Sequence, residues 1–261
     1  RPSSLTIRMP FVTLTYAQAL DGSIAGPLGA AGPRLLLSGE RAMTLTHGLR
    51  ASHDAILVGV NTLIADDPQL TVRLVDGNSP IRVILDSKLR VPLGARALRK
   101  QPSSSSTQTQ EAASSSPPPH ALIVTLDGVL HDPNSLQKLN ALQGMGVTVV
   151  GVQADGEHVC LKSALTALHD HHHIQSVMIE GGAAVIGSCA KNRLANRIIV
   201  TLAPQTLVNG LRPGAETQES PMAAQGCLKR VQAFCLGDDV VVSGEGPAAV
   251  AANGRPLVSK L

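Results

Sequence analysis

Short apolar runs recur along the chain and alternate with segments of helical spacing. Seven of these runs predict buried strands, at residues 11–17, 55–60, 82–85, 121–125, 147–152, 176–179 and 197–202. Their near-continuous apolar character is typical of parallel strands that are covered on both faces. We therefore expect an α/β protein with a mainly parallel, twisted sheet and helices on both of its faces.

Four segments between these runs have the periodicity of amphipathic helices. Ser38 stands where it can cap a first helix, whose apolar residues share one face. Asp132 followed by Pro133 predicts the start of a second helix. Residues 161–169 predict a third helix, and the segment after Gly182 predicts a fourth.

Two regions depart from this alternation. Apolar runs at 231–235 and 240–242 flank a Gly-Asp turn, which predicts a C-terminal antiparallel hairpin. Residues 101–119 are dominated by Ser, Pro, Gln and Thr, so we expect a disordered low-complexity insertion there. The chain is otherwise interpreted as one domain over 1–261, with a loose tail at 244–261.

Composition and charge narrow the classes of function. The net charge of +3 is scattered and aromatic residues make up 1% of the chain, so we expect no nucleic-acid partner. We expect no membrane partner either, because no apolar run reaches the length of a span. The four cysteines form no Cys-x-x-Cys pair, which favours reduced thiols in a cytoplasmic protein. The histidine-rich stretch 169–173 lacks partners at ligand spacing, and no metal site is expected.

Segment 176–191 is the strongest candidate for chemistry. Its apolar strand stops at Glu180, turns through Gly181 and Gly182 and leads into a helix. Glycines leave backbone N–H groups open, and the positive end of a helix attracts phosphate. Glu180 follows the strand's carboxyl end, where open α/β sheets bind ligands. The alternative is a tight turn with a structural role only.

A second cluster follows the second predicted strand. Thr62 places a hydroxyl near the strand end, one of Asp66 and Asp67 can accept from a ribose hydroxyl while the other caps a turn, and Arg73 can hold a phosphate through two bonds. Arg34 and Arg50 bracket the first predicted helix, where both can meet an anionic substrate. Turn-forming carboxylates and solvated surface arginines are the alternatives for these residues.

Four segments together resemble one family of enzymes. They are residues 10–22, 49–59, 65–73 and 178–184, and in this order and spacing they are similar to the riboflavin-biosynthesis pyrimidine reductases. The resemblance covers about 10–243, apart from the low-complexity insertion. It implies a dihydrofolate-reductase-like fold, NADPH as cofactor, a phosphorylated pyrimidine substrate and a homodimer.

The resemblance also implies a reaction. It is the NADPH-dependent reduction of the ribosyl side chain of 2,5-diamino-6-ribosylamino-4(3H)-pyrimidinone 5′-phosphate to a ribitylamino product. The Thr-Tyr-Ala-Gln motif that starts at Thr15 is similar to that of fungal members, in which reduction precedes deamination. Many bacterial members carry a Lys where this chain has Thr15. The alternatives are a 5-amino-6-(5-phosphoribosylamino)uracil reductase and a catalytically silent dinucleotide-binding module.

Three groups of residues are candidates for this site, and the resemblance implies the substrate and cofactor contacts among them. Glu180 and Asp21 are the catalytic candidates, for handling a proton or orienting the iminium, although Asp21-Gly22 also predicts a plain turn. The substrate contacts implied are Arg34, Arg50, Leu70, Arg73 and Glu180. The cofactor contacts implied are Ala17, Thr62, Asp66, Ser87, Gly181, Gly182, Ala183, Ala184, Val185 and Ile186.

Overall fold

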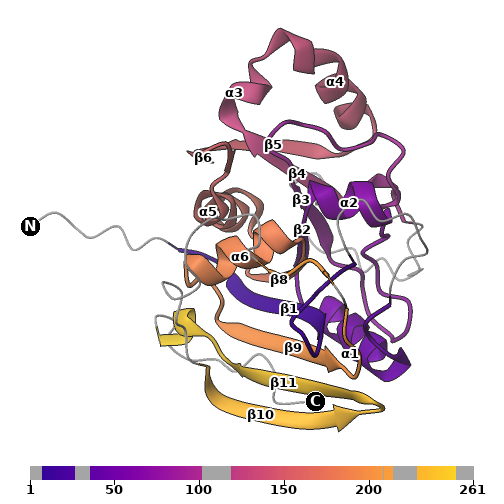
Figure 1. Ribbon diagram of the computed structural model, residues 1–261. Helices are drawn as coiled ribbons and strands as arrows, with labels where there is room; N and C mark the ends of the chain where they lie inside the picture. The colour runs from indigo at the N-terminus through magenta and orange to yellow at the C-terminus, as the bar shows by residue number, and fades with distance from the viewer. Residues whose placement is uncertain (1–7, 27–35, 102–118, 208, 214–227, 251–261) are drawn as a thin grey trace, which may run out of the picture.

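A computed structural model describes residues 8–26, 36–101, 119–207, 209–213 and 228–250. Nine strands form one sheet: β1 (Phe11–Ala19), β2 (Ala55–Gly59), β3 (Ile81–Leu85), β4 (Ala121–Leu126), β5 (Thr148–Val152), β8 (Ser176–Gly181), β9 (Arg197–Ala203), β10 (Lys229–Leu236) and β11 (Asp239–Glu245). Their order is β10-β11-β9-β1-β8-β2-β3-β4-β5 (Figure 1). A separate small hairpin, which the pattern did not predict, pairs β6 (Ala154–Asp155) with β7 (His158–Val159).

The strands from β9 to β5 are parallel, whereas β11 is antiparallel to both β9 and β10. The mainly parallel sheet and the C-terminal hairpin are therefore confirmed. Strand β11 includes Gly244 and Glu245, so the expected loose tail does not begin at 244. Residues 102–118 of the expected insertion and 251–261 of the tail lie outside the described residues.

Helices cover both faces of the sheet, as predicted (Figure 1). The described helices are α1 (Glu40–Ala51), α2 (Val60–Asp66), α3 (Asp127–Leu130), α4 (Leu136–Gly144), α5 (Leu161–His172) and α6 (Ala183–Lys191), with short 3₁₀ turns η1 (Arg96–Leu98), η2 (Pro133–Ser135) and η4 (Pro247–Val250). In the described ranges, no helix combines the length and apolar character needed to cross a bilayer.

The two faces of the sheet build separate cores because side chains alternate along each strand. Leu57 of β2 belongs to the core under α5 and α6. Its neighbours Ile56 and Val58 belong to the core under α2 and α4. Cys189 of α6 is fully buried in the first core, where burial raises the pKa of its thiol to about 12. The sheet is thus fixed between two apolar layers, and its carboxyl edge is left for chemistry.

Three helix boundaries differ from the prediction. Gly39, and not Ser38, is the N-cap of α1. Asp132 does cap, by accepting a bond from the Asn134 N–H at 3.0 Å, but it opens η2, and α4 begins only at Leu136. Helix α5 continues to His172 and not only to 169, so most of the histidine-rich stretch belongs to its last turn.

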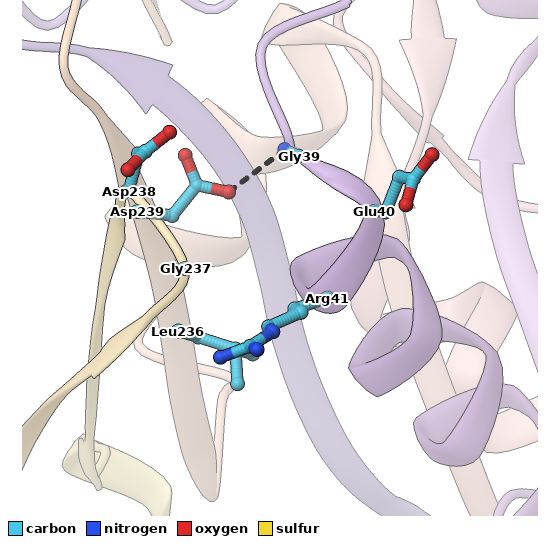
Figure 2. A pocket seen from close by; sticks show the side chains of 7 residues that line it. All are labelled: Gly39, Glu40, Arg41, Leu236, Gly237, Asp238 and Asp239. Atoms are coloured by element: carbon cyan, nitrogen blue, oxygen red, sulfur yellow. Dashed lines mark hydrogen bonds between the residues drawn. The ribbon is translucent and has the colours of Figure 1, made fainter.

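The start of α1 is held by the turn of the C-terminal hairpin. The Gly39 N–H donates to Asp239 Oδ2 at 2.8 Å, and Asp239 is 3% exposed (Figure 2). A carboxylate at this end of a helix also interacts favourably with the helix dipole. The contact therefore replaces the cap expected from Ser38, and it joins residues that are two hundred positions apart.

We predict that Asp239→Ala lowers the free energy of unfolding by about 1–2 kcal/mol, because it removes the acceptor at the start of α1. Urea unfolding followed by circular dichroism measures the loss. Asp238→Ala, at the exposed neighbouring position, is the matched control and should change stability little. Equal losses in the two variants would contradict the capping role.

Candidate active site at the carboxyl edge of the sheet

Two strand-to-helix turns lie next to each other at the carboxyl edge. Strand β2 runs into α2 through Gly59, and the neighbouring β8 runs into α6 through Gly182. The pairing register of the two strands shifts here: Leu57 pairs with Ile179, whereas Val58 pairs with Gly181. Glu180 is thus the extra residue at an irregularity of the kind that re-aims side chains beside active sites.

The two turns approach each other too closely for larger residues. Gly182 has a φ of +86°, and a Cβ there would meet Thr62 Oγ1 at 3.2 Å. A Cβ at Gly59 would meet a methyl group of Val185 at 3.0 Å. Neither helix start has a side-chain cap. Thr62 and the residues after Gly182, predicted from distant parts of the sequence, therefore do converge, and their backbone N–H groups suit an anion.

A buried ion pair stands beside these turns. Arg50 of α1 is 6% exposed, and its Nε donates to Glu180 Oε2 at 2.9 Å while its Nη2 pairs with Oε1. Both carboxylate oxygens accept, so Glu180 is ionised in this arrangement. The third nitrogen, Nη1, donates to the Thr71 carbonyl oxygen at 3.1 Å. Arg50 therefore ties α1 to the end of β8 and to the segment that precedes Arg73.

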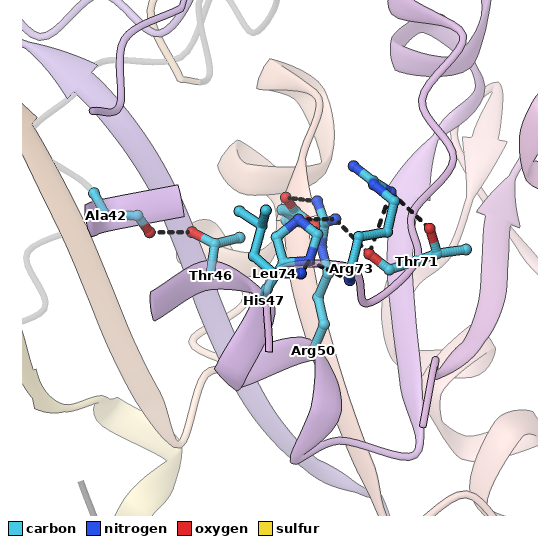
Figure 3. A network of polar contacts seen from close by, with 8 residues as sticks. Ala42, Thr46, His47, Arg50, Thr71, Arg73 and Leu74 are labelled. Carbon is cyan, nitrogen blue, oxygen red and sulfur yellow. Dashed lines mark hydrogen bonds and ion pairs between the residues drawn. The ribbon is translucent and has the colours of Figure 1, made fainter. Parts of the chain in front are cut away.

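The same face of α1 holds the backbone around Arg73 through His47 (Figure 3). The Arg73 N–H donates to His47 Nδ1 at 2.8 Å, and Arg73 Nη1 donates to Thr71 Oγ1 at 2.6 Å. His47 is fully buried, and Arg73 is exposed. Burial, followed by the charges of Arg50 and Arg73, lowers the pKa of His47 to about 4, with Glu180 acting in the opposite direction.

His47 and Thr71 are the members of this network that sequence reasoning missed. The available signal was helical spacing, because His47 stands three residues before Arg50 and thus on the same face. Thr71 contributes mainly its backbone carbonyl, which residue type does not reveal.

The other predicted site residues occupy varied positions. Asp66 is exposed at the end of α2, and Leu70 is 3% exposed within the core under α2. Ser87 Oγ accepts a bond from the Val159 N–H at 3.0 Å, which links the turn after β3 to β7. Ala17 is half-buried in β1 and pairs with β9. Arg34 lies outside the described residues.

Asp21 is engaged within its own turn. It accepts bonds from the Ser23 hydroxyl at 2.7 Å and from the Leu207 N–H at 3.3 Å. The Ser23 bond is the main reason that the pKa of Asp21 lies below its usual range, and the Leu207 bond acts in the same direction. These contacts favour the turn-forming interpretation over a proton-donating one.

The cavity drawn in Figure 2 lies elsewhere, between the start of α1 and the hairpin turn. It is lined by residues 39–41 and 236–239, which include none of the predicted site residues. Within the part of the chain that the structure describes, no three His, Cys, Asp or Glu residues gather as metal ligands. The candidate site is therefore the edge formed by the two glycine turns and the Arg50–Glu180 pair.

A parallel sheet with two uncapped helix starts and a guanidinium–carboxylate pair at one edge is typical of an α/β enzyme that binds a small anionic molecule. Comparison with known proteins defines the family. The model of the RibD C-terminal domain matches residues 10–242. The chain therefore belongs to the RibD C-terminal domain family.

Individual relatives agree with this assignment. Riboflavin biosynthesis protein RibD of Aquifex aeolicus is 33% identical over 211 residues, 80% of this chain and 51% of that protein. The 2,5-diamino-6-ribosylamino-4(3H)-pyrimidinone 5′-phosphate reductase of Methanothermobacter thermautotrophicus is 33% identical over 241 residues, 89% of this chain and 96% of that protein. Among solved structures, Acinetobacter baumannii RibD superimposes with a TM-score of 0.68 at 27% identity, covering 91% of this chain and 58% of the other. The chain thus spans about half the length of the RibD relatives.

We predict that His47 makes stability sensitive to acid. His47 is neutral in the fold down to about pH 4, whereas the unfolded chain takes up this proton near pH 6.5. The free energy of unfolding should therefore fall as the pH drops from 6.5 to 4, because the unfolded state binds more protons there. In His47→Asn, the free energy of unfolding, measured between pH 4 and 6.5, should change less with pH than in the wild type. The difference in slope should be up to about 1.4 kcal/mol per pH unit. Parallel curves would show that His47 is not held neutral.

Proposed function

We propose that this chain is an NADPH-dependent reductase of riboflavin biosynthesis. It acts on 2,5-diamino-6-ribosylamino-4(3H)-pyrimidinone 5′-phosphate and converts the ribosyl group to ribityl. The observation that carries the proposal is the position of the Arg50–Glu180 pair and Arg73 beside two glycine turns at one sheet edge. Membership of the RibD C-terminal domain family supports it, as does the reductase name of the Methanothermobacter relative, which this chain matches over nearly its whole length.

The residues at the glycine turns fit a dinucleotide phosphate. A Cβ at Gly182 would be a tight contact, 3.2 Å from Thr62 Oγ1, and α6 begins without a side-chain cap. A diphosphate can therefore accept bonds from the open N–H groups of Ala183 and the residues after it. NADPH would supply a hydride for the substrate's C1′ atom. The residues that would hold it are Gly181, Gly182, Ala183–Ile186, Thr62, Ala17, Asp66 and Ser87.

Glu180 is suited to stabilise positive charge. The C1′–O4′ bond of the ribosylamino group must break, with O4′ taking a proton from water, to give an iminium whose C1′ can accept a hydride. A carboxylate next to that cation lowers its energy. Because Glu180 accepts two bonds from Arg50, it is fixed in place and does not carry a proton to donate. We therefore assign Glu180 to orienting and stabilising the iminium, and we prefer it to Asp21, which is engaged in its own turn.

Arg73 is the stronger candidate for the substrate's 5′-phosphate. All three guanidinium nitrogens of Arg50 have protein partners. In the described part of the chain, the hydrogen bonds of the Arg73 guanidinium come from Nη1 alone, and the residue is exposed. Arg73 can thus meet a phosphate with its remaining N–H groups, while Arg50 adds positive charge from behind.

The order of reduction and deamination is open to a direct test. Thr15 is buried in β1 and brings no charge to the site, as expected for the type that reduces first. Purified protein is given NADPH with either the diaminopyrimidinone or the aminouracil phosphate, and loss of NADPH absorbance is followed. Faster turnover of the diaminopyrimidinone is expected. Faster turnover of the uracil would reverse the order, and NADPH binding without product from either would favour a silent dinucleotide-binding module.

We predict that Gly182→Ala raises the dissociation constant for NADPH at least about tenfold, because its Cβ intrudes beside Thr62 and the φ of +86° disfavours any side chain. Calorimetric titration measures the affinity. Gly156→Ala, in the β6–β7 turn, also places a side chain at positive φ but in open space, so it controls for backbone strain. A folded Gly182→Ala with wild-type affinity would remove this turn from the cofactor site.

We predict that Arg73→Ala raises the KM for the pyrimidine phosphate about 10- to 100-fold, the range for losing a charge-assisted hydrogen bond. The KM for NADPH should change less than about twofold. Arg41→Ala removes an exposed arginine from the first turn of α1, beside the cavity of Figure 2, and is the charge-matched control. If both KM values rose equally, Arg73 would not be the phosphate contact.

A further inference from the structure

His47 is a buried polar residue for which the proposed reaction has so far no use. It is 0% exposed in the middle of α1, one helical turn before Arg50. Its ring contacts the two arginines of the candidate site. Nδ1 accepts from the backbone N–H of Arg73, and Nε2 lies 3.5 Å from Arg50 Nη1. The imidazole thus stands between the two arginines assigned to the anionic substrate.

The segment that carries Arg73 needs such a contact. Residues 71–74 belong to no helix or strand, so no ladder of backbone bonds fixes them. Contacts from α1 hold them: His47 Nδ1 accepts from the Arg73 N–H at 2.8 Å, with the Leu74 N–H at 3.4 Å, and Arg50 Nη1 donates to the Thr71 carbonyl. Within the loop, the Val72 N–H donates to Ser79 Oγ at 3.0 Å. Loss of the Nδ1 acceptor would leave the Arg73 backbone N–H without this partner.

The charge of the acceptor matters as much as its position. A carboxylate at this place would accept the same bond, but its negative charge would pair with Arg50 or Arg73 and oppose a phosphate. A neutral imidazole accepts the bond and leaves the positive charge of both arginines for the ligand. Nδ1 is the acceptor, so the ring proton of the neutral form is on Nε2.

We propose that His47 is a positioning residue for phosphate recognition: it holds the backbone of Arg73 by a neutral acceptor, so that the Arg73 guanidinium is presented beside Arg50 with its charge available. This inference rests on the proposed function and extends it to a residue that does not touch the substrate. It assigns a specificity role to the buried face of α1.

Three substitutions separate acceptor, charge and packing. His47→Asn keeps a neutral acceptor, since its Oδ1 stands at the same place along the side chain as Nδ1. His47→Asp keeps an acceptor of the same size but adds negative charge, and His47→Leu removes the acceptor. Thr46→Ala is the control on α1, because the Thr46 hydroxyl bonds only the Ala42 carbonyl of its own helix in the described contacts (Figure 3).

The readouts are the two KM values in the reductase assay and, independently of turnover, calorimetric binding of ribose 5-phosphate. We expect His47→Leu and His47→Asp to raise the KM of the pyrimidine phosphate, and to weaken ribose 5-phosphate binding, by about tenfold or more. His47→Asn and Thr46→Ala should stay within about threefold of wild type. The KM for NADPH should be unchanged in all four. If His47→Leu does not fold, the isosteric Asn and Asp variants decide the matter.

The outcomes distinguish this inference from the function on which it rests. Wild-type ligand affinity in both His47→Leu and His47→Asp would overturn the role of His47 while leaving the reductase proposal intact. Equal losses in Asn and Asp, or a parallel rise in the KM for NADPH, would also overturn it, because they indicate a merely structural residue. The wild type could instead reduce neither pyrimidine, while the four variants still ranked as expected in their affinity for ribose 5-phosphate. The proposed reaction would then be wrong, and the role of His47 would stand.

Discussion

The pair formed by Arg50 and Glu180 is the contact on which the rest of the site depends. Arg50 is almost fully buried, and a buried charge without its partner costs several kcal/mol. The two-point contact satisfies that charge and at the same time joins helix α1, the end of β8 and the segment before Arg73. One ion pair thus fixes Glu180 relative to the segment that carries Arg73, the two residues to which we assign the iminium and the phosphate.

This arrangement is possible because the polar residues of the candidate site lie at one edge of the sheet. The apolar strands are buried between two helical layers, so the polar residues at the strand ends gather at the carboxyl side. There the glycine turns of β2 and β8 offer backbone donors, and α1 and the following loop offer charged side chains. In the proposed site the cofactor phosphates would bind at the glycine turns and the substrate phosphate at the loop held by α1, with Glu180 of β8 between them.

Much of the fold follows from the apolar pattern, because a strand buried on both faces must be apolar throughout its length. The seven parallel strands and the hairpin agree with the prediction to within two residues at the parallel strands' ends. The continuation of β8 through Glu180 and Gly181 could not be predicted, since it depends on a register shift against β2. The cap of α1 by Asp239 was missed for a similar reason, because its partner is distant in the sequence.

For the site, residue type and resemblance selected Glu180, Gly182 and Thr62, but the contacts between them needed the fold. The Arg50–Glu180 pair spans 130 positions, and neither residue alone indicates the other. His47 was not selected from the sequence, because a single histidine on a helix gives no sign of the backbone N–H that it meets. Arg73 could be named from its motif, whereas its dependence on α1 could not.

The most direct measurement is a crystal structure of the protein with NADPH and a non-reducible analogue of the substrate. The account predicts diphosphate density at the start of α6, the reactive nicotinamide carbon facing the analogue's C1′ atom, and the 5′-phosphate on Arg73 with Glu180 beside C1′. Ordered NADPH at another place on the protein, or the 5′-phosphate bound away from Arg73, would contradict it.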